Sequence, residues 1–484
     1  MRKIKTSLLV IFLAALLIQG CSLGKSEETI TLTVSDDMTS SVSVVKNSDS
    51  DTITVTKTIT AEDIKNATAV KDGESITKAG TYVLSGEYTK TVTVEADKED
   101  DVIIILNGAT IISDDGPAIS ATKCNSLLVY LVDGTVNTLT DANEYADTSD
   151  SAPTGALFCK NDLSIEGEGT LVVNGNKKHG IVSKDNLYIN GGIIEVSARK
   201  DGLHGGDSLT INAGTITVKE SNEGVEAELI TINGGTLDIT AKDDGINATS
   251  DEITPVITIN GGTVTVNSNG DGLDSNGNLE LNGGYVYVSG ATNDGNASVD
   301  YDGTFMANGG TLISTGMSGM YQSVTNGSGN YVIDYMSDTT IEAGTKCALY
   351  DGDKVLAEFE VLKNANSILI TAAELEDGKE YTLKVGESSE TVTAGESTVK
   401  GFGGFGGFGG PEGPGNFNPG ERPDFGDASG NGGFGGPGGD FNGEFPEGFK
   451  IPEGFDGNPP EGFEPPEGMT PPDGFSGGKK DKNN

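Results

Sequence analysis

Apolar and polar residues alternate in short runs along most of this chain, and one arrangement of runs recurs four times within residues 201–294. Each copy begins with an acidic residue, Gly, an apolar residue and a polar residue, in the forms DGLH, EGVE, DGIN and DGLD. An alternating run, Asn-(Gly/Ala)-Gly and a second alternating run follow. Alternation between apolar and polar residues predicts half-buried strands, and Asn-Gly predicts a tight turn between them.

The Asn of this motif sets the repeat length. In steps of 22, 21, 27, 22 and 26 residues, it recurs at Asn190, Asn212, Asn233, Asn260, Asn282 and Asn308. A period near 22 with occasional insertions is typical of a solenoid whose loops vary on one side. The third apolar position that a three-sided coil requires is held by Leu203, Val225, Ile246 and Leu273. The sequence therefore predicts an all-β protein built around a right-handed parallel β-helix with coils of about 22 residues.

Hairpins are the alternative, because Asn-Gly between two strands also predicts a β-hairpin. A β-sandwich or a propeller would be made of such hairpins. A propeller blade has about 40 residues, however, which is far longer than this repeat. The frames of leucine-rich and RTX repeats are missing. The parallel β-helix is therefore the preferred interpretation.

Composition divides the rest of the chain. Residues 22–72 are predicted to form a linker and an N-terminal β cap, because runs such as TITVTKTIT lie there. The β-helix is predicted over residues 73–320. Runs such as VLAEFEVL and SILITA predict a small antiparallel β-domain over residues 321–398. Residues 399–484, with GFGGFGGFGG and repeated PEGF, are predicted to be a disordered Gly/Pro/Phe tail.

Residues 1–21 have the pattern of a lipoprotein signal peptide. Arg2, Lys3 and Lys5 precede an apolar run that ends in Ile-Gln-Gly-Cys21. Acylation of Cys21 would anchor the protein to the outer face of the cell membrane, because two acyl chains suffice for stable attachment. An ordinary secretory cleavage, or an uncleaved anchor, is the alternative.

The totals restrict the partners. The 484 residues carry a net charge of −42, which argues against binding nucleic acid through its phosphates. Trp is absent, which weakens any case for sugar binding driven by ring stacking alone. Cys124 and Cys159 precede comparable strands, so they either form a disulfide or remain buried thiols, and Cys347 is left over.

Aligning the copies on the Gly after the acidic residue gives two columns of polar side chains. The first column is predicted to hold Asp201, Glu223, Asp244, Asp271 and Asp294. The second is predicted to hold His204, Glu226, Asn247, Asp274 and Ala297. In a β-helix such neighbours lie ~5 Å apart. Two carboxylates at that distance repel by about 3 kcal/mol at an effective dielectric constant of about 20, so the columns need a counter-cation.

Calcium is the cation that these columns predict. Carboxylate and amide oxygens are its preferred ligands, and the chain shows neither metal-binding thiolates nor clustered imidazoles, so zinc and copper are not expected. The alternative is that Asp-Gly simply forms turns with solvated acids. That alternative explains the first column, but it does not explain Glu223, Glu226 or Asp274.

Six further residues are candidate carbohydrate contacts: Arg199, Lys200, His204, Lys242, Tyr285 and Tyr287. The two tyrosines are predicted to face outward on a strand, where their rings would form a sugar platform; ordinary surface residues are the alternative. The basic residues would contact acidic sugars, or would only neutralise the acidic edge.

The motifs also carry a resemblance. TKAGTYVLSGEY, LVYLVDGTVNTLTD, NEGVEAELITINGGTLDI and NGDGLDSNGNLELNGG, in this order, resemble the calcium-binding carbohydrate-binding β-helix family of clostridial surface proteins. The resemblance covers residues 73–320. It implies a pectate-lyase-like shape, binding of plant polysaccharides including polygalacturonic acid, and Ca²⁺ held by the EGVE and DDGIN copies.

The sequence therefore predicts a non-catalytic, calcium-dependent protein that binds an acidic plant cell-wall polysaccharide such as pectin at the cell surface. A polysaccharide lyase of pectate-lyase type is one alternative, because Arg199 and Lys200 beside Asp201 resemble a base next to calcium. A surface adhesin with a protein partner is another.

Overall fold

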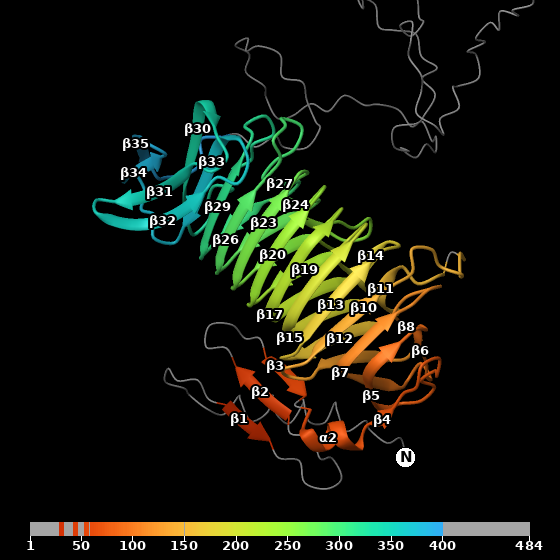
Figure 1. The fold of residues 1–484 in the computed structure, drawn as a ribbon. Coiled ribbons are helices and arrows are strands. Elements are labelled where there is room, and N and C mark those ends of the chain that lie inside the picture. The colour runs from red at the N-terminus through yellow and green to blue at the C-terminus, as the bar shows by residue number, and fades with distance from the viewer. Residues whose placement is uncertain (1–28, 33–41, 47–52, 58, 150, 400–484) are drawn as a thin grey trace, which may run out of the picture. The chain divides into compact units, whose positions relative to one another are not determined.

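The computed structural model describes residues 29–32, 42–46, 53–57, 59–149 and 151–399 (Figure 1). Cys21, the predicted signal peptide and the predicted tail beyond residue 399 lie outside the described residues. In the described part of the chain, no helix has both the length and the hydropathy needed to cross a membrane.

The described chain begins with a small antiparallel sheet and one short helix. The sheet holds β1 (Thr29–Leu32), β2 (Val42–Lys46) and β3 (Ile53–Lys57). Helix α2 (Ala61–Asn66) follows directly after the TITVTKTIT run, within the predicted N-terminal cap. The Thr60 hydroxyl accepts from the Asp63 amide while the Asp63 carboxylate accepts from the Thr60 amide, so a capping box starts the helix.

Parallel strands then stack into a solenoid with three faces, as Figure 1 shows. Short strands make up the third face, a nine-stranded sheet: β6 (Val92–Glu95), β8 (Ile119–Lys123), β11 (Gly155–Cys159), β14 (His179–Ser183), β16 (Leu203–Gly205), β18 (Val225–Ala227), β21 (Ile246–Ala248), β24 (Leu273–Ser275) and β27 (Val299–Tyr301). The prediction of an all-β parallel solenoid is confirmed.

The other two faces share one long sheet. The first face holds β9 (Ser126–Leu131), β12 (Asp162–Gly167), β19 (Leu229–Ile232), β22 (Val256–Ile259), β25 (Asn278–Leu281) and β28 (Phe305–Ala307). The second holds β10 (Val136–Thr140), β13 (Thr170–Gly175), β20 (Thr236–Ala241), β23 (Thr263–Ser268), β26 (Tyr285–Ser289) and β29 (Thr311–Gly316). Four long strands contribute to both faces: β5 (Gly80–Tyr88), β7 (Asp101–Ile112), β15 (Asn186–Ala198) and β17 (Ser208–Ser221). The short β4 (Thr68–Ala69) pairs with β5.

Apolar ladders fill the interior of the coils. On the third face, Leu203 pairs with Val225, and the same register continues through Ile246, Leu273 and Val299. All five are almost fully buried. Burying one such side chain contributes about 1.5–3 kcal/mol, so the repeated apolar positions supply the driving force for stacking.

The predicted Asn positions form a hydrogen-bonded ladder at the corner between the first two faces. From Asn212 onward, each amide nitrogen donates to the side-chain oxygen of the Asn one coil earlier, at 2.7–3.1 Å. The ladder runs through Asn190, Asn212, Asn233, Asn260, Asn282 and Asn308. The same corner that makes the turn therefore also links the coils.

Antiparallel strands follow the last coil. Strand β33 (Ala365–Ala372) lies between β29 and β30 (Tyr331–Ile341), so it covers the open edge of the solenoid sheet. A second sheet has the order β32 (Lys354–Glu360), β31 (Lys346–Asp351), β34 (Glu380–Val385) and β35 (Ser388–Thr393).

The three cysteines of the described chain are free and buried. Cys124 and Cys159 lie on neighbouring coils with their sulfur atoms 4.0 Å apart. Their side chains are therefore neighbours, as their positions before comparable strands suggested.

Candidate functional site

The site is built at the turn that leads into each short strand of the third face. The backbone makes this turn with a Gly, whose amide donates to the next coil: Gly202 to Glu223 O at 2.9 Å and Gly224 to Asp244 O at 3.0 Å. At Gly245 a Cβ would lie 2.2 Å from a Val266 methyl group, so no larger residue fits. The residue before the Gly and the second residue after it therefore keep fixed places on every coil.

Two columns result, one on each side of the turn. We call the residues before the Gly the turn column: His179, Asp201, Glu223, Asp244 and Asp271. We call the paired positions on the strands the strand column: His204, Glu226, Asn247, Asp274 and Asp300.

The structure corrects the last coil of the predicted alignment. Asp274 pairs with Asp300, and the Gly272 amide donates to Ala297 O at 3.1 Å. Ala297 thus ends the turn column, and Asp294 is exposed in a longer loop outside it. The prediction placed Asp294 and Ala297 three residues too early, because the insertion before the last strand hid the register.

At one end of the columns lies the acidic centre, which we define as Asp271, Asp274 and Asp300. Their ligand oxygens lie within 4.8 Å of one another. Burial, followed by the charges of Asp244, Asp271 and Asp300, raises the pKa of Asp274 to about 8. Burial also raises the pKa of Asp271, to about 7, although a hydrogen bond from the Ala297 amide opposes this. Three half-buried carboxylates in contact demand protons or a cation.

The middle of the columns holds a second oxygen cluster. Asn247 donates to Glu223 at 3.3 Å, while the Asn247 side-chain oxygen is buried without a hydrogen-bond partner among the described residues. Burial and the neighbouring Glu226 raise the pKa of Glu223 to about 8. An orphaned amide oxygen beside two carboxylates is a donor set that a hard cation would satisfy.

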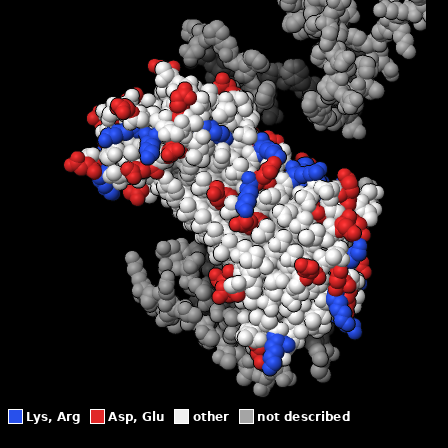
Figure 2. Space-filling view, in the orientation of Figure 1, with Lys and Arg blue, Asp and Glu red and all other residues white. Residues whose placement is uncertain are grey.

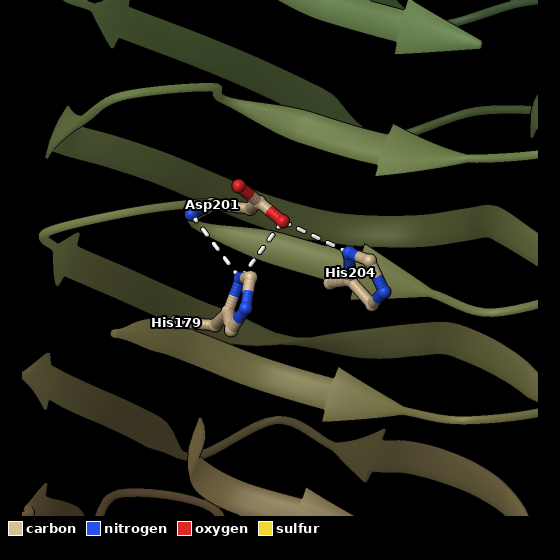
Figure 3. Close-up of side chains that lie close together, drawn as sticks. All are labelled: His179, Asp201 and His204. Carbon is tan, nitrogen blue, oxygen red and sulfur yellow. Dashed lines mark hydrogen bonds and ion pairs between the residues drawn. The ribbon is translucent and has the colours of Figure 1, made fainter. Parts of the chain in front are cut away.

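The other end of the columns differs, because imidazoles gather there. His179 and His204 both direct Nδ1 at one carboxylate oxygen of Asp201, as Figure 3 shows. Burial opposes a charged ring, but hydrogen bonds to Asp201 and Glu226 raise the pKa of His204 to about 9. Burial lowers the pKa of His179. The expectation that imidazoles do not cluster in this chain was wrong.

His179 is the residue that the sequence pattern did not single out. Its coil reads His-Gly-Ile-Val, which has the Gly and the apolar position of the motif but neither acidic residue. The Gly180 amide donates to Asp201 O at 2.9 Å, so this coil stacks in the same frame as the others. Extending the Gly-apolar frame by one coil toward the N-terminus would have found it.

The remaining basic candidates stand apart from the acidic centre. Arg199 and Lys200 are exposed at the turn before Asp201. Lys242 forms an exposed ion pair with Glu220 at 2.5 Å. On the face drawn in Figure 2, basic side chains lie beside acidic ones and form no continuous basic patch among the described residues.

The two candidate tyrosines differ in their exposure to solvent. Both belong to β26 on the second face, while the columns lie along the third face. Tyr285 is 36% exposed, as predicted, but Tyr287 is only 8% exposed. The ring of Phe359 packs 6.1 Å from that of Tyr287, whose hydroxyl donates to Glu360 O at 2.7 Å. The prediction that Tyr287 faces solvent was wrong, because β32 covers it.

A solvent-facing pocket of about 260 Å³ adjoins the columns. Its wall includes His204 and Glu226 of the strand column, together with Glu228, Thr249, Ser250 and Asp251. The polar columns are therefore reached from outside the coil.

Comparison with known proteins places these features in a family. A sequence profile described as "Carbohydrate-binding domain-containing protein" matches residues 71–255 and 229–399. A protein of that description from Acetivibrio thermocellus is 31% identical over 141 residues, which are 28% of this chain and 49% of that protein. The chain thus spans about half the length of this relative. A solved structure described as a polysaccharide lyase-like protein from C. thermocellum, a gadolinium derivative, covers 52% of this chain and 93% of its own, with 28% identity and a TM-score of 0.40.

Proposed function

This chain belongs to the carbohydrate-binding domain-containing protein family, and from that premise we propose that it binds an acidic polysaccharide through calcium without cleaving it. The acidic centre of Asp271, Asp274 and Asp300 carries the proposal. A chain with a net charge of −42 repels an acidic polymer, so a cation must lie between them.

Calcium suits the donors at this end of the columns. It takes six to eight oxygen ligands, and the acidic centre with Asp244 offers carboxylates only. The buried, unpartnered oxygen of Asn247 on the adjoining coil supports the same assignment. With one oxygen from each carboxylate, the acidic centre and Asp244 would supply four ligands and leave places for a sugar carboxylate or hydroxyl.

The pocket beside His204 and Glu226, at the histidine end of the columns, suggests where a further sugar unit of the same polymer would lie. Its volume of about 260 Å³ is of the order of a small-ligand site, and Thr249 and Ser250 add hydroxyl groups to its wall. Pectin-type polymers of galacturonate are the proposed partner because each unit carries a carboxylate. Acylation at Cys21 is proposed to hold the protein at the outer face of the cell membrane.

Retention on immobilised polygalacturonate tests this function. We expect retention with Ca²⁺, release by chelator, and no retention of Asp274→Asn. Asp238→Asn is the matched control, because Asp238 is an exposed carboxylate on β20 of the second face. Chelator-resistant retention, or equal retention of both variants, would contradict the proposal.

Cellulose and turnover assays separate the alternatives. Calcium-dependent retention on polygalacturonate but not on cellulose indicates recognition of the acidic group. A lyase would give a steady rise in absorbance from unsaturated products. If the unsubstituted protein shows that rise and Arg199→Ala loses it, the protein is a lyase and the binding proposal is wrong.

A further inference from the structure

This 484-residue chain has two histidines, His179 and His204, and both lie at one end of the columns. His179 Nδ1 lies 2.8 Å and His204 Nδ1 lies 2.9 Å from the same Asp201 oxygen. The ring centroids are 5.1 Å apart. Each histidine comes from a different coil, so stacking of the solenoid alone brings them together (Figure 3).

A fourth donor completes the cluster. Glu226, on the next coil, places a carboxylate oxygen 3.2 Å from His204 Nδ1. The ligand atoms of His179, Asp201 and His204 all lie within 4.8 Å of one another.

The Asp201 side chain is the second, independent sign of a ligand. It is only 1% exposed, and its Oδ1 atom has no hydrogen-bond partner among the described residues. The Asp201 amide donates to His179 Nδ1 at 3.4 Å, so this nitrogen lies against both the amide and the carboxylate of Asp201. A buried carboxylate oxygen without a partner costs free energy, and a bound cation would offset that cost.

We infer that His179, Asp201 and His204, with Glu226, form a site for a borderline divalent transition-metal ion of the Zn²⁺ class. Imidazole nitrogen and carboxylate oxygen suit zinc, cobalt and nickel, whereas calcium prefers oxygen alone. Tetrahedral zinc at about 2.0–2.1 Å from each donor separates its donors by about 3.4 Å. The distances of 2.8–3.2 Å, which join each histidine to Asp201 and His204 to Glu226, are close to this separation.

The ion would connect three successive coils, through β14, β16 and β18. His204 and Glu226 also line the solvent-facing pocket, which provides an entry path. The columns would then hold two kinds of metal, with a transition metal at the histidine end and a hard cation at the acidic centre. This site does not depend on the proposed calcium function.

Imidazole NMR of the full chain tests the site directly, because its two ring systems belong to His179 and His204. We expect one equivalent of Zn²⁺ to shift the ¹⁵N signals of both rings, and Ca²⁺ to leave them in place. Calorimetry with Zn²⁺ should show one site, and His204→Gln should weaken it at least tenfold.

Two further variants distinguish this site from the acidic centre and from the buried thiols. Asp274→Asn should bind Zn²⁺ like the parent protein while losing its calcium response, so failure of either proposal is recognised separately. Cys124→Ser should also bind Zn²⁺ normally; loss of binding there would assign the ion to the neighbouring thiols. Ring signals that Zn²⁺ leaves unmoved, in the unsubstituted protein, would show a hydrogen-bonded cluster only and overturn the site.

Discussion

Replacing Asp274 by Asn gives the sharpest test of the acidic centre, because it removes one charge and keeps the shape. The carboxylate of Asp274 faces those of Asp271 and Asp300, and the three are half-buried. Without calcium, the Asp274 carboxylate repels its neighbours and destabilises the fold. With calcium, the same carboxylate is a ligand of the ion. We therefore expect the same substitution to stabilise the calcium-free protein and to destabilise the calcium-loaded protein relative to the parent.

The separation of the carboxylates sets the magnitude. The ligand oxygens of the centre lie within 4.8 Å of one another. Two unit charges at that upper limit repel by about 3.5 kcal/mol at an effective dielectric constant of about 20. We expect Asp274→Asn to raise the free energy of unfolding without calcium by about 3 kcal/mol at pH 8, or about 5 °C in melting temperature.

The pH dependence has a definite sign. The pKa of Asp274 is raised from 3.8 to about 8 in the folded chain. Its contribution to stability is therefore fully present below about pH 4 and is lost as the pH rises toward 8. The calcium-free parent should lose stability across this window, and Asp274→Asn should lose less. Calcium affinity should rise over the same window, because the ligands must lose their protons.

Urea unfolding followed by circular dichroism, at several pH values with calcium or chelator, measures these effects. Asp238→Asn serves as the control for removing a surface charge. If Asp274→Asn destabilises the protein in chelator, the carboxylates of the acidic centre do not repel one another as argued. If calcium stabilises Asp274→Asn as much as the parent, the acidic centre does not bind the ion.

Three substitutions test other parts of the structure. Asn260→Ala breaks two bonds of the Asn ladder and should cost about 1–2 kcal/mol in urea unfolding; an unchanged midpoint would show that the ladder adds no stability. Gly245→Ala places a Cβ 2.2 Å from a Val266 methyl group and should cost about 1–3 kcal/mol, so a variant as stable as the parent would contradict the close packing of the turn. Tyr287→Phe loses the hydrogen bond to Glu360 and should cost about 1 kcal/mol in melting experiments while leaving polygalacturonate retention intact; reduced retention would return Tyr287 to the binding surface.

The amino-acid sequence by itself determined the solenoid and most of the columns. A period near 22 residues with identical apolar positions fixes which side chains face inward. Within a copy, only one apolar residue separates the Gly from the polar residue that follows, so the position of this polar residue relative to the turn is the same in every coil. For this reason Glu226, Asn247 and Asp274 were predicted as one column, and the structure pairs them directly.

Tertiary structure decided what depends on insertions and on contacts between distant segments. The longer loop before β27 put Asp300, rather than Ala297, beside Asp274. Strand β32 buried Tyr287, which its own alternating strand could not reveal. The meeting of His179 and His204 on Asp201 follows from stacking, since a histidine in an otherwise apolar copy has no local sign of its partners. A repeat fixes the positions within each coil, but the register between coils brings together the charges that bind.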